Sequence, residues 1–143
     1  MTVRLSPYLS FRDDARPAME FYRSLFGGQL VVTAFGDMDM AAMGMGDDPS
    51  EAQKVMHAQL ETDDGLVLMA SDTPSSMEHV PPAGISISLS GDDEARLRRW
   101  WEGLTDGGAV TMPLEQAPWG DLFGMCTDRF GTSWMVSISA PSA

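Results

Sequence analysis

The sequence has one cysteine, Cys126, and only two histidines among its 143 residues. A lone cysteine cannot form an internal disulfide, which is typical of proteins in a reducing compartment. The chain also lacks an apolar run of membrane-spanning length, and its first residues lack the basic and apolar regions of a signal peptide. We therefore expect a soluble, cytoplasmic protein that does not bind membranes.

Basic residues are scarce as well. There are 9 Lys and Arg against 21 Asp and Glu, which gives a formal net charge of −12. Such an acidic surface repels phosphate backbones, so we do not expect nucleic-acid binding through a basic patch. It would attract a cationic ligand, although an acidic surface is more often a solubility feature. Apolar residues make up 43 % of the chain, enough for the core of one domain.

Two stretches of the chain resemble one another. Helical segments end at the glycine pairs Gly27-Gly28 and Gly107-Gly108, which are 80 residues apart, and a β-prone run follows each pair. Further along, Gly65 and Gly131 each precede a strand-like run, but their offset is 66 residues. The difference of 14 residues indicates an insertion in the first copy, and residues 36–52, rich in Met, Gly and Asp, fit that role as a long loop.

Each copy is interpreted as a strand, a helix and three more strands, that is, βαβββ. The expected strands are residues 5–11, 29–35, 54–61 and 66–71 in the first copy and residues 84–90, 109–114, 122–127 and 133–139 in the second. The helices carry apolar stripes at helical spacing: Ala18, Met19, Tyr22, Leu25 and Phe26 in the first, and Leu97, Trp101 and Leu104 in the second. We expect an α+β fold with two curled mixed or antiparallel sheets around a cavity and the helices outside.

The same pattern predicts the domain organisation. We expect a single domain over residues 1–143, with a first half at about 1–72 and a second half at about 84–140. The segment between them, residues 73–83, is rich in proline and is expected to be a linker.

Alternation along the strands assigns side chains to the two faces of each sheet. In the strand at 133–139, Trp134 and Val136 are expected to face the helix, which leaves Met135 on the opposite face. In the strand at 54–61, that opposite face receives His57 and Gln59. When two such sheets curl toward each other, this face lines a cavity instead of facing water.

Several short motifs fall within this organisation. They are Pro7–Phe11, Glu20–Tyr22 with Phe26–Gly28, Lys54–Ala58, Leu68–Asp72, Trp119–Asp121, and Asp128–Gly131 with Ser133–Met135. Together with the tandem βαβββ halves they resemble the vicinal-oxygen-chelate superfamily of glyoxalases, bleomycin-resistance proteins and dioxygenases, and within it the PhnB-like branch. The resemblance implies a small-molecule cavity and a two-fold homodimer whose sites form where halves of the two subunits meet.

Metal-dependent members of that superfamily place His or Glu on the cavity face of the first and last strands of each half. Glyoxalase-type members hold a carboxylate four residues after the last turn glycine, and this count leads here to Met69 and Met135. The first-strand positions, near Ser6–Tyr8 and Ile85–Ser86, offer neither imidazole nor carboxylate. Because a thioether is a poor ligand for hard divalent ions, we expect no bound metal and no cofactor.

The side chains that remain on the expected cavity face form the candidate ligand-binding site. They are Tyr8, His57, Gln59, Met69, Ser86, Ser88, Trp119, Phe123, Met125 and Met135. His57 could contact a ligand or transfer a proton, although a buried, hydrogen-bonded histidine is commoner, and no catalytic residue is assigned. Trp119 follows Pro118 in a hairpin and either caps the cavity or packs on the surface. Cys126 is expected to face the helix as an inert core residue.

Four methionines in residues 36–52 allow two interpretations. Met38, Met40, Met43 and Met45 resemble the thioether clusters that hold cuprous ion. An adaptable, mobile lid over an apolar cavity is favoured, because methionine fills irregular space and no export signal accompanies the cluster.

Three functions remain open at this point. The favoured one is metal-independent binding or sequestration of a small molecule that is cationic or partly apolar, as in the drug-resistance branch. The second is a metal-dependent glyoxalase-type lyase, isomerase or transferase with non-standard ligands. The third is a dimeric interaction protein whose cavity is vestigial. The fold cannot choose among them, because the superfamily includes all three kinds, and whether the chain is an enzyme stays open.

Overall fold

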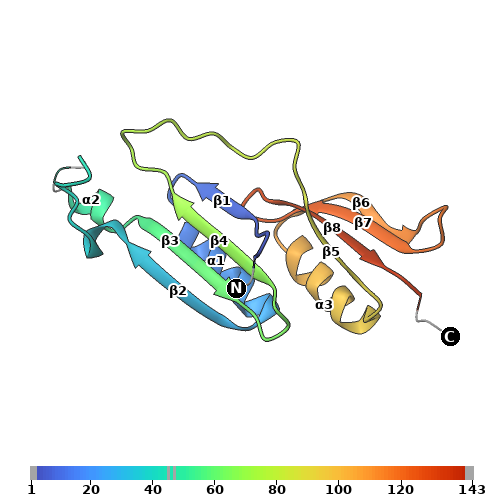
Figure 1. Cartoon of the computed structure of the whole chain (residues 1–143). Helices are drawn as coiled ribbons and strands as arrows, with labels where there is room; N and C mark the ends of the chain where they lie inside the picture. Colours follow the sequence, from blue (N-terminus) through green and yellow to red (C-terminus); the bar gives the residue numbers. More distant parts are fainter. Residues whose placement is uncertain (1–2, 45, 47, 141–143) are drawn as a thin grey trace. The chain divides into compact units, whose positions relative to one another are not determined.

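The computed structural model describes residues 3–44, 46 and 48–140 (Figure 1). The chain divides into two compact units, Met1–Pro82 and Ala83–Ala143, called the first and second unit below. That the two units belong to one domain remains a prediction. None of the described helices is long and apolar enough to cross a membrane.

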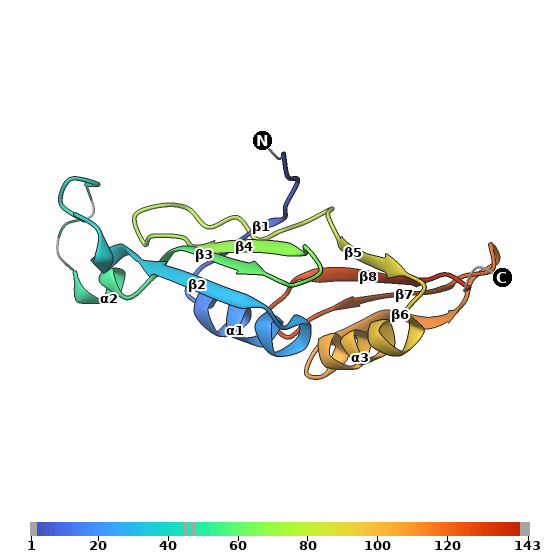
Figure 2. The same ribbon diagram turned by 60° about the horizontal axis from the view of Figure 1, so that its bottom comes forward.

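The first unit is a four-stranded mixed sheet with a helix on one face (Figure 2). Its elements are β1 (Tyr8–Phe11), α1 (Ala15–Phe26), β2 (Gln29–Ala34), a 3-10 turn (Phe35–Asp37), α2 (Pro49–Ala52), β3 (Val55–Glu61) and β4 (Val67–Asp72). The strand order is β1-β4-β3-β2, with β1 parallel to β4 and the other neighbours antiparallel. α1 packs on this sheet and buries Ala18, Met19 and Tyr22 completely.

The second unit repeats this arrangement. Its elements are β5 (Ile87–Gly91), α3 (Glu94–Thr105), β6 (Ala109–Gln116), β7 (Leu122–Thr127) and β8 (Ser133–Ile138). The strand order is β5-β8-β7-β6, and β5 is again parallel to β8. The predicted α+β fold with two βαβββ halves is therefore confirmed.

The two glycine pairs share the conformation of their first glycine and the surroundings of their second. In Gly27-Gly28 and Gly107-Gly108 the first glycine has a φ of 75° and 77°, respectively, which L side chains rarely adopt. A Cβ on the second glycine would lie 2.2 Å from the carbonyl oxygen of Glu61 in one unit and 2.3 Å from that of Thr127 in the other. Both pairs are needed because the chain leaves each helix pressed against the end of the sheet's third strand.

Core packing follows the predicted alternation, with one correction. Trp134 and Val136 are buried on the α3 side of their sheet, as expected. The buried stripe of α3, however, uses Trp100 and not the expected Trp101. Trp101 is half-buried because its ring covers Gly124 of β7, where an added Cβ would lie 2.8 Å from the ring.

Two strand boundaries and one loop also differ from the predictions. The first strands of the two halves start at Tyr8 and Ile87, three residues later than expected, because their pairing with β4 and β8 begins only there. Residues 36–52, called the insertion below, are not entirely a loop, since they contain α2. The Asp48 carboxylate caps α2 by accepting a hydrogen bond from the Ser50 N–H at 2.9 Å.

Candidate functional site

Three of the predicted site residues lie in one row across the first sheet, on the face opposite α1. Strand pairing places Tyr8 of β1 opposite Met69 of β4, Met69 opposite Gln59 of β3, and Gln59 opposite Val31 of β2. Val31 was not part of the sequence prediction and is exposed. The row thus combines a phenol and an amide with a thioether and an aliphatic side chain.

A hydrogen-bonded chain links this row to His57. The Tyr8 hydroxyl lies 3.0 Å from His57 Nδ1, and His57 Nε2 lies 3.3 Å from Gln59 Oε1. An amide oxygen only accepts hydrogen bonds, so Nε2 carries the proton and the Nδ1 lone pair accepts the Tyr8 hydroxyl hydrogen. Tyr8 is 49 % exposed, and the lone pairs of its oxygen remain available as acceptors. The chain can therefore accept a hydrogen bond from an N–H or O–H group of a ligand.

The corresponding row of the second unit is dominated by thioethers. Ser88 of β5 lies opposite Met135 of β8, Met135 opposite Met125 of β7, and Met125 opposite Met112 of β6. Sequence reasoning placed the first three on this face but missed Met112. The pairing of β6 with β7 shifts register on both sides of Met112, so simple alternation along this strand fails.

The remaining predicted residues lie beside this second row. The rings of Trp119 and Phe123 meet edge to face with centroids 5.5 Å apart, and Trp119 stays 64 % exposed. Ser86 is half-buried and directly precedes β5, outside the paired residues of the strand. Whether Trp119 caps a cavity remains a prediction.

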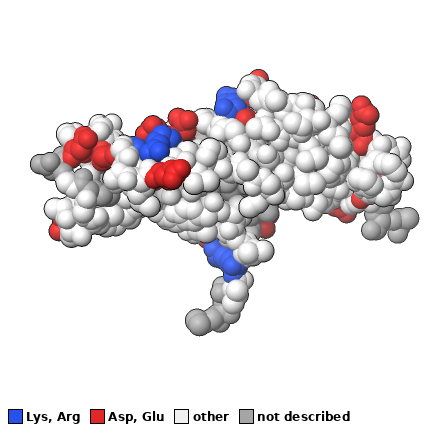
Figure 3. All heavy atoms as spheres, turned by 90° about the horizontal axis from the view of Figure 1, so that it is seen from above, with Lys and Arg blue, Asp and Glu red and all other residues white. Residues whose placement is uncertain are grey.

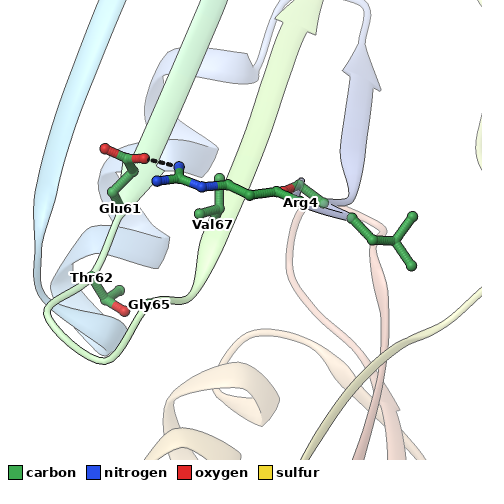
Figure 4. Close-up of a pocket in the computed structure, with 7 residues that line it drawn as sticks. Arg4, Glu61, Thr62, Gly65 and Val67 are labelled. Atoms are coloured by element: carbon green, nitrogen blue, oxygen red, sulfur yellow. Dashed lines mark hydrogen bonds and ion pairs between the residues drawn. The ribbon is translucent and has the colours of Figure 1, made fainter. Parts of the chain in front are cut away.

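Two hollows in the first unit contain none of the ten predicted residues. The smaller, of about 460 Å³, lies between the segment before β1 and the β3–β4 turn (Figure 4). There the Arg4 guanidinium reaches over β4 to bond the Glu61 carboxylate, whose pKa this hydrogen bond and charge lower. The two charges neutralise each other, and neighbouring Leu5 is fully exposed, so this is an open surface depression.

The two hollows lie on opposite sides of the row that runs across the sheet from Tyr8 to Val31, called the Tyr8 row below. Three alternate residues of β4 show this order. Val67 lines the smaller hollow, Met69 belongs to the row, and Ser71 lines the larger hollow. β1 and the residues before it follow the same order, with Ser10 lining the larger hollow. The face of the first sheet opposite α1 is thus continuous, with the hydrogen-bonded chain at its middle.

The described methionines of the insertion do not share one environment. Met40 is buried, whereas Met38 and Met43 are exposed, and Met43 lines the larger hollow. Met45 lies outside the described residues. The proposed lid over an apolar cavity is compatible with the position of Met43, and its mobility stays a prediction.

Cys126 is a core residue, as expected. Its side chain is 2 % exposed on the α3 side of β7, and burial, followed by the charge of Asp128, raises the pKa of the thiol to about 11. The thiol is therefore protonated near neutral pH and is a poor nucleophile.

The face drawn in Figure 3 is mostly uncharged, with acidic side chains in small separate groups. The net charge of −12 creates a general field that favours cations.

Two βαβββ units with matching strand orders define the class of this chain. A sequence model of the Glyoxalase/Bleomycin resistance protein/Dioxygenase superfamily matches residues 4–136, and the chain belongs to this superfamily. Protein YjdN of Escherichia coli K12 is 28 % identical over 140 residues, which cover 94 % of each chain.

Solved structures agree with this assignment. Protein PA1353 of Pseudomonas aeruginosa is 35 % identical with a TM-score of 0.84, covering 98 % of this chain and 100 % of that one. The PhnB protein of Bacillus cereus is 24 % identical with a TM-score of 0.74, covering 96 % and 100 %. The predicted resemblance to the superfamily and to PhnB-like proteins is confirmed.

Metal-dependent members of the superfamily imply a divalent ion, and the donor chemistry of the two rows does not fit one. The last strands supply Met69 and Met135, and their first-strand neighbours are Tyr8 and Ser88. Among the residues of the two rows and the hydrogen-bonded chain, His57 is the one strong metal ligand. A tightly held divalent ion needs at least three such ligands. Within residues 3–44, 46 and 48–140, no three His, Cys, Asp or Glu side chains lie close enough to share an ion.

Proposed function

We propose that this chain binds a partly apolar small molecule that carries a hydrogen-bond donor, such as a protonated amine, and does so without a divalent metal. The observation that carries the proposal is the Tyr8–His57–Gln59 chain beside Met69 on one open sheet face. Its order of donors and acceptors leaves the Tyr8 oxygen as an acceptor, which favours a ligand with an N–H or O–H group.

Each sheet, taken by itself, offers contacts for the apolar part of such a ligand. Met69 and Val31 flank Gln59 in the first row, and the second unit offers three thioethers in a row. Thioethers adapt to irregular shapes and contact aromatic groups favourably. The acidic net charge raises the local concentration of cations. Binding or sequestration of this kind matches the drug-resistance members for which the superfamily is partly named.

Tyramine and metal ions together test the proposal by calorimetry. Tyramine combines an aromatic ring with an ammonium donor, and its carboxylate counterpart 3-(4-hydroxyphenyl)propionate has the opposite charge. We expect tyramine to bind in a metal-free buffer and the carboxylate to bind more weakly. Nickel, zinc, manganese and ferrous ions should show no micromolar site. Tight one-to-one metal binding that disappears in His57→Ala would overturn the metal-free proposal and favour the metal-dependent enzyme.

A two-fold homodimer and a cytoplasmic location are retained as proposals. In the superfamily, sites can form between subunits, so a dimer would complete the open faces of the two sheets. Light scattering at micromolar concentration tests this directly. A monomer would contradict both the homodimer and the alternative role as a dimeric interaction protein.

A further inference from the structure

The larger hollow of the first unit is a pocket with a floor and two walls, which come from separate segments of the chain. It has a volume of about 720 Å³, within the range of small-molecule sites. Its floor is the Ser10 and Ser71 end of the first sheet, opposite α1. One wall comes from the insertion and the 3-10 turn before it, through Met43 and Phe35. The other wall is formed by residues 73–80, the strap, which follow β4.

A buried lysine joins the two walls. Lys54 is almost completely buried, and its Nζ donates to the carbonyl oxygen of Thr73 at 2.9 Å. The same ammonium forms ion pairs with Asp13 at 3.1 Å and with Glu51 of α2 at 3.5 Å. Glu51 in turn accepts a hydrogen bond from the Ser75 N–H at 2.7 Å. The insertion and the strap are therefore fixed to each other beside the pocket.

A second anchor holds the far part of the strap. The Arg12 guanidinium donates to the carbonyl oxygens of Pro74 and Met77, both at 3.3 Å. The Thr73 N–H also bonds the carbonyl oxygen of Phe11, at the end of β1. Because the strap is held at several points, the pocket exists before any ligand binds, which lowers the entropy cost of binding.

The lining is mainly apolar but includes hydroxyl groups from Ser10, Ser71, Thr73 and Ser76, and its only charged residues among those described are acidic. Three thioethers, from Met43, Met56 and Met77, face the pocket together with aliphatic and aromatic carbon. Both carboxylate oxygens of buried Asp72 accept backbone N–H groups at 2.9 Å, so its charge is already stabilised within the protein. Glu78 is exposed at the pocket, and the described lining residues include no Lys or Arg.

We propose that this pocket is a second ligand site, selective for a compact organic cation with an apolar body, such as a quaternary ammonium. The thioethers contact the apolar body, and the Glu78 carboxylate attracts the cation. The site differs from the Tyr8 row in its chemistry, because a quaternary ammonium has no N–H to donate to Tyr8. It extends the proposed function, and its test can fail without that function failing.

Benzyltrimethylammonium and N,N-dimethylbenzamide are suitable probes, since the first is a cation, the second is neutral and neither donates a hydrogen bond. The protein is labelled with ¹³C at its methionine methyl groups, and each probe is titrated while the spectrum is recorded. We expect the cation to shift the signals of Met43, Met56 and Met77. Glu78→Gln should weaken its binding about threefold, the effect of an exposed ion pair. The neutral probe should bind both proteins equally.

Glu20→Gln is the matched control, because it removes one exposed carboxylate from α1 and changes the net charge equally. It should leave the affinity for benzyltrimethylammonium unchanged. Shifts confined to Met69, or no shift at all, would refute the pocket while leaving the tyramine test untouched. Equal weakening of both probes in Glu78→Gln, or equal weakening of the cation in Glu20→Gln, would refute selectivity for cations at this site.

Discussion

The two sheets share a backbone but differ in the side chains of the face opposite their helices. In the first unit this face has the Tyr8–His57–Gln59 chain, whereas the second has Met112, Met125 and Met135 at its centre. Methionine at the equivalent positions Met69 and Met135 is what the two rows have in common. The strand order is common to both units, whereas the side chains of the two rows differ in chemistry. The first face therefore suits a hydrogen-bonding ligand, and the second suits apolar contact.

The largest expected effect tests the shared backbone. Gly108→Ala should lower the free energy of unfolding by about 3 kcal/mol, because the new Cβ would lie against a fixed carbonyl oxygen. Gly28→Ala should cost about 4 kcal/mol, because Gly28 has the same close contact and also a φ of 91°. Gly65→Ala is the comparison: its φ is 87°, but no atom lies within 4 Å of the added Cβ, so a loss of about 1 kcal/mol is expected. Urea denaturation measures all three. If only one of Gly28→Ala and Gly108→Ala caused a small loss of stability, the two copies would not be structurally equivalent at this position.

A smaller effect on stability should distinguish the turn before β8 in the second unit from the turn before β4 in the first. Asp128 accepts hydrogen bonds from the Phe130 and Thr132 N–H groups and from the Trp134 indole, at 2.8, 3.1 and 2.8 Å. Its counterpart in the first unit, Thr62, accepts one from the Leu66 N–H at 3.0 Å.

Asp128→Ala should therefore cost about 2–3 kcal/mol of stability, and Thr62→Ala about 0.5–1 kcal/mol. Thermal unfolding of both variants makes the comparison. If Thr62→Ala is the more damaging change, the assigned difference between the turns is wrong.

Lowering the pH should destabilise the first unit through protonation of Glu51. A hydrogen bond from Ser75, together with the charge of Lys54, holds the pKa of Glu51 below its ordinary value of 4.5. The ionised carboxylate thus stabilises the fold above that value, and the contribution is lost as pH falls through the lowered pKa. Glu51→Gln should cost about 1 kcal/mol at pH 7 and less as the pH approaches 3. A pH-independent loss in Glu51→Gln would contradict the assignment.

The smallest effect concerns Cys126 in the core of the second unit. With the pKa of the thiol at about 11, a disulfide reagent at pH 8 should react with the native protein far more slowly than with the urea-unfolded chain. We expect the rate to differ by at least about tenfold, because burial adds to the low thiolate fraction. Absorbance of the released thiol follows the reaction. Equal rates would place the thiol outside the core.

The sequence was informative where local rules decide the structure. The offsets between glycines revealed the repeat, and alternation along β3 and β8 assigned His57, Gln59 and Met135 to the face opposite the helix. The resemblance to a known superfamily then indicated which positions would hold a metal. Each of these inferences depends on residues that are close in sequence or on a period of two.

Long-range contacts account for what was missed. The larger pocket depends on the hydrogen bonds from Lys54 to Thr73 and from Arg12 to the strap. No sequence pattern within residues 73–80 predicts these partners. Bulges hid Met112, and a helical stripe alone could not choose Trp100 over Trp101. Such features emerge only once the chain is folded, because they depend on how separate segments meet.

One titration tests the central claim, that the first face selects a hydrogen-bond donor through Tyr8. Tyramine is added to protein labelled with ¹³C at the methionine methyl groups, in wild type and in Tyr8→Phe, and the signals of Met69 and Met135 are followed. We predict that the Met69 signal shifts in the wild type and that Tyr8→Phe weakens this binding about three- to tenfold, the loss of one hydrogen bond. Any shift of Met135 should be unaffected by the variant. Identical affinity at Met69 in the two proteins would contradict the account.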